Sequence, residues 1–297
     1  MQWDAEPIRG VPEVRIQVPG DNEPLFVPVA VAEDQARFEA ALHELVAGLD
    51  GDAPVDRVRR ALGRVGGVTE RDAEALSGTY QRLRQLKRDG RNDIWPFVLR
   101  NLVRPIWLAG EGQRADVLIG NPPWIAYRHL SAEMQTRLRT ASLTYGLWVG
   151  GVLATQQDMA ALFWARCAER YLKRGGTISF VMPFAALNRP AFDAVRRGSF
   201  GGVSVRIVEA WNLSEVRPLF PTSACVLIGC RAAVGRSPAT VERFSGFLTR
   251  RDAGEDEADA ELERETAAWP PITTLQGGSV YRQRFTNGAT IYPRRFF

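Results

Sequence analysis

The fold is decided by the stretch Ala115-Asp116-Val117-Leu118-Ile119-Gly120-Asn121-Pro122-Pro123-Trp124. Its aliphatic run, Val117 to Ile119, predicts a short strand that is buried on both faces of a sheet. The run breaks into Gly-Asn-Pro-Pro, where neither proline can donate a backbone hydrogen bond and Pro123 keeps Pro122 out of the helical region. We therefore expect a stiff, extended loop at the carboxyl end of a central strand, where open α/β sheets bind their ligands.

This loop carries an amide at Asn121 and a large flat ring at Trp124. An exocyclic amino group on a base is a weak nucleophile, because its lone pair is delocalised into the ring. A carboxamide oxygen and a proline carbonyl can each accept one N–H of that group, which favours the tetrahedral nitrogen that attacks an electrophilic methyl. An aromatic ring can stack on a base that has left the duplex. The alternative is a loop that only needs two prolines, with Trp124 as a core residue.

Length and composition describe a globular chain of one or two domains, with 297 residues of which 45% are apolar. No run of about 18 apolar residues predicts a membrane span, and no charged-then-apolar leader opens the chain, so we expect a cytoplasmic protein. Three cysteines without a CxxC pair read as reduced thiols, and two distant histidines do not suggest a metal site. A net charge of +4 leans mildly towards polyanionic partners.

Before the central strand, the periodicity predicts a hairpin or pair of strands followed by helices. The strands are expected at 14–18 and 25–31, and amphipathic helices at 33–49, 55–62 and from Thr69 to about Arg88. Asp72, three residues after Thr69, is a weak variant of a capping box. A mostly buried helix is expected over 94–108, with Pro96 in its first turn and Pro105 ending or kinking it.

After Trp124, helices and β-rich runs alternate. A helix is expected from Asp158 to Lys173, stopping at Gly175-Gly176, with a helix over 190–197 and central strands near Asp116, Ile178, Val205 and Val226. This alternation predicts an α/β fold with right-handed βαβ units and a largely parallel sheet. Residues 251–265 read as a solvated acidic helix or a loose insertion, and 285–295 as a tight turn and a strand. The aromatic and arginine side chains after the loop have two open interpretations, a nucleic-acid surface or packing against the loop: Tyr127, Arg128, Tyr145 and Trp148.

Together these features resemble the adenine-N6 DNA methyltransferases of restriction–modification and related phage-defence systems, over roughly residues 94–297. Asn121, Pro122, Pro123 and Trp124 match the catalytic Asn-Pro-Pro-aromatic motif. The resemblance implies a Rossmann-like sheet that binds S-adenosyl-L-methionine, methyl transfer to a flipped adenine in double-stranded DNA, and stacking of that base on Trp124. Leu219 to Ala224 resembles a later motif, which makes Phe220 a second stacking candidate beside its interpretation as a core residue.

The same resemblance assigns cofactor contacts to Asp158 and Phe163, at the start of the helix that precedes the Lys173-to-Gly176 turn. It also implies three regions, which are a helical and hairpin region over 1–93, the catalytic-loop half of the methyltransferase over 94–250, and an acidic insertion leading into a target-recognition region over 251–297. The run from Asn287 to Arg295 looks like the junction with that recognition region.

The chain departs from this family in its cofactor loop. A cofactor-binding methyltransferase needs a glycine-rich loop after its first strand and then an acidic residue for the ribose. The nearest candidate, Gly63 to Gly67, follows a segment that is too charged for a central strand. The chain therefore resembles the C-terminal half of the methyltransferase domain with an N-terminal helical insertion. Such a half is either inactive alone or completed by a polypeptide that supplies the cofactor-binding half.

Two other functions stay open. One is a methyltransferase that acts on protein glutamine or on RNA, because those enzymes share Asn-Pro-Pro-aromatic loops. The other is a non-catalytic DNA-binding module of a defence system, which keeps the loop that faces DNA. Binding of labelled S-adenosylmethionine separates an intact catalytic site from a fragment or a binding module.

Overall fold

The computed structural model describes residues 7–8, 11–18, 23–91, 94–150, 154, 156–232 and 238–271. The chain divides into two compact units, Met1–Arg114 and Ala115–Phe297, which we call the first and second units. The helix expected over 94–108 lies in the first unit, so this division differs from the sequence-based boundary at 93/94, whose functional regions stay a prediction. The turn and strand expected over 285–295, and the junction from Asn287 to Arg295, lie outside the described residues.

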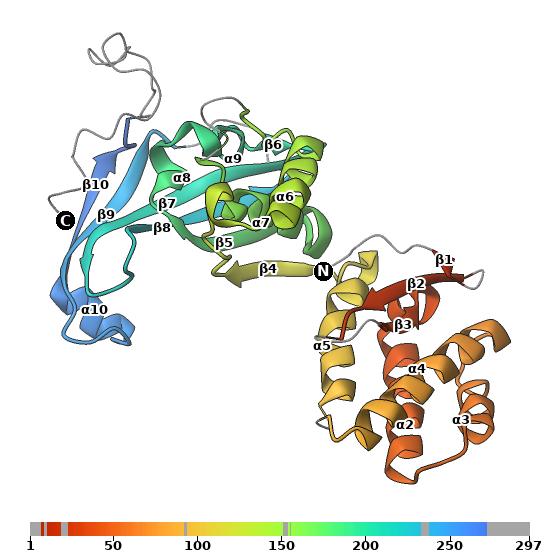
Figure 1. Ribbon diagram of the computed structural model, residues 1–297. Helices are drawn as coiled ribbons and strands as arrows, with labels where there is room; N and C mark the ends of the chain where they lie inside the picture. Colours follow the sequence, from red (N-terminus) through yellow and green to blue (C-terminus); the bar gives the residue numbers. More distant parts are fainter. Residues whose placement is uncertain are drawn as a thin grey trace, which may run out of the picture. The chain divides into compact units, whose positions relative to one another are not determined.

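The first unit combines a three-stranded antiparallel sheet with a helical layer (Figure 1). The predicted strand pair is present, with Val14 opposite Val27. The predicted capping box is also present, because Thr69 and Asp72 exchange side-chain and backbone hydrogen bonds at the start of α4. Pro105 does not end its helix, which continues to Leu108. The elements are β1 (Pro7–Ile8), β2 (Val11–Ile16), β3 (Leu25–Pro28), α1 (Val29–Ala32), α2 (Gln35–Asp50), α3 (Val55–Leu62), α4 (Glu70–Arg88), α5 (Trp95–Leu108) and η1 (Glu111–Gln113).

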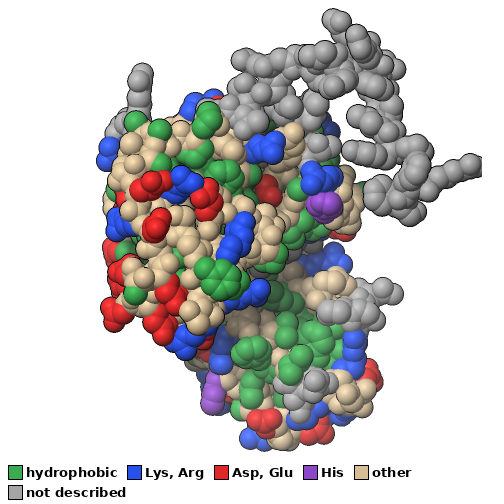
Figure 2. All heavy atoms as spheres, turned by 90° about the vertical axis from the view of Figure 1, so that its left-hand side faces the viewer, with side chains coloured by type: hydrophobic (Ala, Val, Ile, Leu, Met, Phe, Trp, Pro, Cys, Tyr) green, Lys and Arg blue, Asp and Glu red, His purple; other side chains and the backbone are tan. Residues whose placement is uncertain are grey.

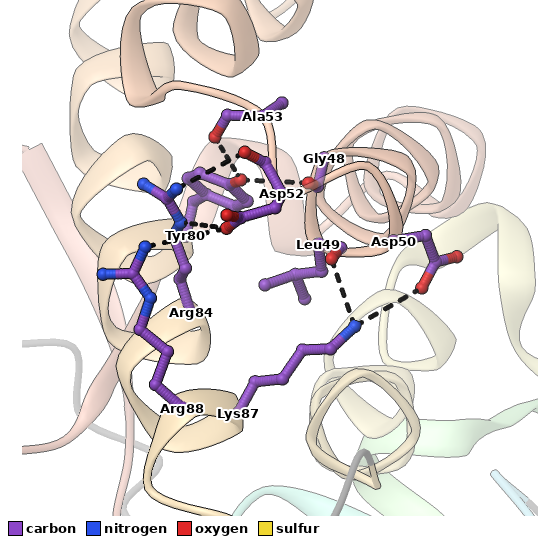
Figure 3. Close-up of polar contacts among 9 residues, drawn as sticks. All are labelled: Gly48, Leu49, Asp50, Asp52, Ala53, Tyr80, Arg84, Lys87 and Arg88. Atoms are coloured by element: carbon purple, nitrogen blue, oxygen red, sulfur yellow. Dashed lines mark hydrogen bonds and ion pairs between the residues drawn. The ribbon is translucent and has the colours of Figure 1, made fainter.

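A buried tyrosine holds the turn between α2 and α3 (Figure 3). The Tyr80 hydroxyl lies 3.0 Å from the Gly48 carbonyl oxygen and 2.6 Å from that of Ala53. Arg84 donates to the Asp52 carboxylate at 2.6 Å, and this ion pair lowers the pKa of Asp52. These contacts join residues about thirty positions apart, so they stabilise the packing of α4 against this turn.

The second unit is built on one mixed sheet with the strand order β10-β9-β7-β8-β5-β4, and β6 pairs with β7 (Figure 1). All four predicted central strands lie in this sheet. The elements are β4 (Ala115–Gly120), η2 (Tyr127–His129), α6 (Ala132–Thr144), α7 (Met159–Tyr171), β5 (Leu172–Pro183), α8 (Ala185–Asn188), η4 (Pro190–Phe192), α9 (Asp193–Arg197), β6 (Ser199–Phe200), β7 (Val203–Arg217), β8 (Ala224–Arg231), β9 (Thr240–Phe247), α10 (Glu255–Glu261) and β10 (Leu262–Ala268).

The prediction of a largely parallel sheet is wrong. The β4–β5 and β7–β9 pairs are parallel, but β8 lies between β5 and β7 and is antiparallel to both. The connection from β7 to β8 spans only residues 218–223, and a connection of that length joins neighbouring antiparallel strands, whereas a parallel crossover needs a dozen or more residues. The long connection that contains α6 and α7 is the one that makes β4 and β5 parallel.

The expectation that the Val117 strand is buried on both faces is also wrong. β4 ends the sheet, and its side chains at Val117 and Ile119 are 56% and 82% exposed. Leu118, on the other face, packs with the main core beside Ile178. The aliphatic run was a correct signal for a strand, but such a run does not distinguish a central strand from an edge strand.

Two further boundaries differ from the prediction. α7 ends at Tyr171 and passes directly into β5, so Gly175-Gly176 lies within the strand and not at the helix end. The acidic segment does form an exposed helix, α10, but Leu262 to Glu265 pairs with β9 and belongs to the sheet.

Among the described residues, no helix combines the length and apolar character needed to cross a membrane.

Candidate functional site

The candidate loop begins where β4 ends. Gly120 pairs in register with Phe180 of β5, and a Cβ atom at Gly120 would come within 3.2 Å of the Phe180 ring, so a glycine lets the strands approach closely here. Pro122 is buried, whereas the side chain of Asn121 is exposed and has no hydrogen-bond partner among the described residues. Because β4 and β5 are parallel, their carboxyl ends meet at one edge of the sheet. The Asn121 amide therefore lies at the carboxyl ends of these strands, where no described residue occupies its hydrogen-bonding groups.

Trp124 is held in place by β5. Its indole Nε1 donates a hydrogen bond to the Val181 carbonyl oxygen at 3.2 Å, and its half-buried ring packs at the border of the core. The Trp124 ring also contacts the ring of Phe220. The two ring centroids lie 5.3 Å apart, at an interplanar angle of 57°. The structure thus brings both predicted stacking residues together, and they contact each other.

Phe220 reaches this position from the loop that joins β7 to β8. In that loop, the Ser223 carbonyl accepts a hydrogen bond from the Phe184 backbone N–H at 2.8 Å, and Phe184 follows the end of β5. Three connections therefore meet at the carboxyl edge of β4 and β5. They are the loop after β4, the turn after β5 and the loop before β8.

The segment after the candidate loop is tied to the start of α7. The Tyr127 N–H donates to the Gln157 carbonyl at 2.7 Å, and the Met159 N–H donates to the Ile125 carbonyl at 3.1 Å, which brackets an isolated bridge between Ala126 and Asp158. This pairing places Asp158 beside the candidate loop, and its role in binding the cofactor stays a prediction.

Asp158 already has a structural function as the N-cap of α7. Its carboxylate accepts a hydrogen bond from the Ala160 N–H at 2.8 Å, and burial raises the pKa of this carboxyl while that bond acts in the opposite direction. Phe163, further along α7, is 38% exposed. Its ring is therefore partly accessible on the surface of α7.

The described residues do not make a complete site for S-adenosylmethionine. Gly63 to Gly67 follows α3, not a strand, so it is not a loop between a strand and a helix. Gly201 and Gly202 form the tight turn between β6 and β7, both with positive φ. Asp158 and Phe163 alone do not grip an adenosine and a carboxylate.

The aromatic residues after the loop separate into two groups. Tyr145 is buried, and its hydroxyl is hydrogen-bonded to Glu169; burial and this contact raise its pKa to about 12. It therefore belongs to the packing of α6 on α7. Tyr127 and Trp148 pack edge to face with centroids 5.2 Å apart, and the Arg139 guanidinium lies 5.7 Å from the Trp148 ring centroid.

Sequence reasoning missed two features of this site, the Val181 carbonyl that anchors Trp124 and the buried Gln157. The Gln157 side chain is fully buried, and neither of its polar atoms has a hydrogen-bond partner among the described residues. The only signal in the sequence for Gln157 was its position as a polar residue just before the N-cap Asp158.

Within the described part of the chain, no cluster of three or more His, Cys, Asp or Glu side chains could hold a metal ion.

Comparison with solved structures shows a distant structural likeness to restriction–modification enzymes and to their methyltransferase subunits. The chain is 13% identical to a nuclease-deletion mutant of the Type ISP restriction-modification enzyme LlaGI, in complex with a DNA substrate mimic, with a TM-score of 0.35 over 82% of this chain and 30% of that one. It is 14% identical to the type I restriction-modification methyltransferase subunit from Streptococcus thermophilus, with a TM-score of 0.32 over 80% of this chain and 55% of that one.

A modification subunit assigned to a type I restriction enzyme from Vibrio vulnificus YJ016 is 12% identical, with a TM-score of 0.29 over 84% of this chain and 56% of that one. The chain thus spans less than two thirds of the length of each of these three proteins. No protein-family model matches the sequence, and no curated protein matches it either. The roles of individual site residues therefore rest on the geometry of the loop.

Proposed function

We propose that this chain is the catalytic-loop half of an adenine-N6 DNA methyltransferase. One observation carries the proposal, namely the exposed, unpartnered amide of Asn121 next to the anchored ring of Trp124, at the carboxyl edge of two parallel strands. An amide and an aromatic face held side by side can bind the hydrogen-bonding edge and the flat face of one base.

The chemistry of the loop follows from its acceptors. The Asn121 side-chain oxygen and the Pro122 carbonyl each accept one N–H of the adenine amino group, which orients the nitrogen lone pair towards the methyl group. Trp124 stacks on the base after it leaves the duplex, with Phe220 as the second ring. Positioned acceptors of this kind contribute on the order of 10²–10³ in rate.

The methyl donor requires a second polypeptide segment in this proposal. S-adenosyl-L-methionine is the expected donor, and Asp158 and Phe163 are the residues on this chain expected to approach it. The exposed apolar side chains of Val117 and Ile119 on an edge strand favour contact with further protein. We therefore expect the cofactor-binding half to attach beside β4.

The experiment uses the native locus, with its flanking reading frames, in a bacterial host that lacks adenine methylation. Sequencing of genomic DNA should find N6-methyladenine at one recurring sequence with the wild-type locus, and none when Asn121→Ala is the only change. An Asn121→Ala locus that methylates as the wild type does would show that the loop is not catalytic. Immunoblotting of the chain controls for loss of protein.

A non-catalytic DNA-binding module is the second candidate. The contact between Trp124 and Phe220 favours it, because two rings must stand roughly 7 Å apart to hold a base between them, and these centroids lie 5.3 Å apart. For this function, the wild-type locus leaves genomic adenines unmodified while the purified chain still binds duplex DNA.

A further inference from the structure

An exposed arginine lies near each of the three connections at the candidate site. Arg128 follows the Asn121–Trp124 loop, Arg189 follows the turn after β5, and Arg217 directly precedes the loop that carries Phe220. Within the described part of the chain, none of these guanidinium groups lies within ion-pair distance of a carboxylate.

The contacts of these side chains leave their charges uncompensated. Arg128 Nε donates to the ring Nε2 of His129 at 3.1 Å, and an Arg217 guanidinium nitrogen donates to the backbone carbonyls of Ser214 and Val216 at 3.0 Å each. Histidine nitrogen and backbone carbonyls orient a guanidinium but do not neutralise it. The positive charge at this edge is therefore available to an anionic partner.

Some exposed arginines elsewhere in the described part of the chain are paired with carboxylates, whereas others, among them Arg64, Arg71 and Arg174, are not. Arg100 pairs with Glu39 at 2.8 Å in the first unit, and Arg137 pairs with Glu133 at 2.6 Å on α6. Arg250 pairs with Glu257 at 2.9 Å beside α10. Figure 2 shows basic and acidic side chains lying next to one another on one face.

The three arginines lie close in sequence to the residues of the candidate site. Arg128 is four residues after Trp124 and Arg217 is three residues before Phe220, while Arg189 closes the turn whose Phe184 is hydrogen-bonded to the Phe220 loop. A site for a single phosphate would need convergent, buried donors. Separate exposed arginines near three different connections suit a partner that presents several spaced phosphates.

We propose that Arg128, Arg189 and Arg217 bind the phosphodiester backbone of the DNA on either side of the base that enters the site. This inference rests on the proposed function, since it places the DNA strand around the same loop. A guanidinium can hold two oxygens of one phosphate in a fixed geometry. Each such contact releases counterions, so it contributes to the salt dependence of binding whatever the sequence.

The test measures the affinity of the full chain for a fluorescent 24-base-pair duplex between 50 and 300 mM salt. The probe variant combines Arg128→Gln, Arg189→Gln and Arg217→Gln. The control variant combines Arg64→Gln, Arg71→Gln and Arg174→Gln, three exposed arginines with no carboxylate partner among the described residues. Arg174 lies near the amino end of β5, away from the site's edge, and both triple variants lose the same net charge.

The probe variant should reduce the slope of log Kd against log salt by about 3, and each single substitution by about 0.9. Its affinity at 100 mM salt should fall roughly 10²-fold, while the control variant keeps the wild-type slope. A wild-type slope in the probe variant, an equal loss in the control variant, or no binding by the wild-type chain at 50 mM salt would each overturn the inference.

The salt-dependence experiment and the methylation experiment can fail independently of each other. A reduced slope together with unmethylated genomic DNA at the native locus leaves the backbone surface standing and refutes methyl transfer. An unchanged slope together with methylation that depends on Asn121 refutes the arginine set alone. Circular dichroism melts of all variants show whether the substitutions leave the fold intact.

Discussion

Replacing Trp124 by alanine should weaken the capture of an extruded adenine by an amount that the structure bounds. Stacking of one base on an aromatic side chain contributes roughly 1–3 kcal/mol. In the free protein, however, Trp124 already contacts Phe220 at a centroid distance of 5.3 Å, and such a pair contributes about 0.5–1.5 kcal/mol. A base between the rings needs roughly 7 Å, so this contact is given up on binding. The net loss should be about 1 kcal/mol, or fivefold in affinity.

The same reasoning makes the effect of Phe220 depend on its role. If both rings stack on the base, Phe220→Ala also costs about 1 kcal/mol of binding free energy. The double variant should then cost about 3 kcal/mol, because it loses two base–ring stacks of about 2 kcal/mol each but no longer has to break the single Trp124–Phe220 contact of about 1 kcal/mol. If Phe220 only covers Trp124, Phe220→Ala should instead tighten binding about fivefold. We expect the first result, because both residues are predicted to stack.

The assay compares two duplexes by fluorescence anisotropy at one fixed salt concentration. In one duplex an adenine faces an abasic site, which lowers the cost of extrusion, and in the other it is paired. The difference between the two affinities isolates base capture from backbone contacts and from any loss of folded protein. Trp211→Ala is the matched control, since Trp211 packs against Phe244 at 5.8 Å elsewhere on the sheet.

Trp124→Ala should lower affinity for the abasic duplex and leave affinity for the paired duplex unchanged. Equal losses on both duplexes would show that Trp124 supports the fold or the backbone contact but does not receive a base. No loss on either would remove the stacking role altogether. A Trp211→Ala variant that behaves like Trp124→Ala would show that the assay reports general damage.

In the first unit, Tyr80→Phe should lower the free energy of unfolding by about 1–3 kcal/mol in urea melts, because the Ala53 carbonyl loses its buried donor; an unchanged midpoint contradicts this. Gly176→Ala should destabilise the second unit by about 1–3 kcal/mol, since its Cβ would come within 2.8 Å of the Asp116 backbone oxygen, and a melting temperature equal to wild type would refute the clash. Burial raises the pKa of Asp158 in the folded state, so the folded protein favours its protonated form and the charged form costs stability at neutral pH. Asp158→Asn, which keeps an N-cap, should therefore raise the melting temperature at pH 7, and the gain should shrink as pH falls towards roughly 4; a gain that grows on acidification has the wrong sign.

Much of the secondary structure followed from short-range signals. The capping box at Thr69 and the periodicity of α2 and α7 depend on residues within one or two turns, so they are visible in a sequence. Strand direction is different. The sequence around Val226 predicted a strand, but nothing in its composition shows that β8 is antiparallel to β5. Only the length of the loop before it carried that information.

The candidate site was predictable as a list of residues and not as an arrangement. Asn121 and Trp124 were expected at the end of a strand, and they are there. The contact between Trp124 and Phe220 joins segments almost a hundred residues apart, and the bond from Trp124 to Val181 depends on the register of β5. Such contacts follow from how strands pair, which local sequence patterns do not determine.

The two edges of the sheet are built differently, and this difference bears on the function. β10 is an edge strand of charged side chains, with Glu265 paired to Arg243 and Arg264 paired to Glu242 across β9. Charged edges discourage pairing with another chain. β4, at the other end, exposes Val117 and Ile119 on a strand whose only ion pair is Asp116 with Lys173 among the described residues. The charged edge strand, β10, lies at the opposite end of the strand order from the candidate loop. The apolar edge strand, β4, leads directly into that loop. An exposed apolar edge strand can pair with a further chain, so the strand that leads into the Asn121 loop is also where we propose that a second polypeptide joins.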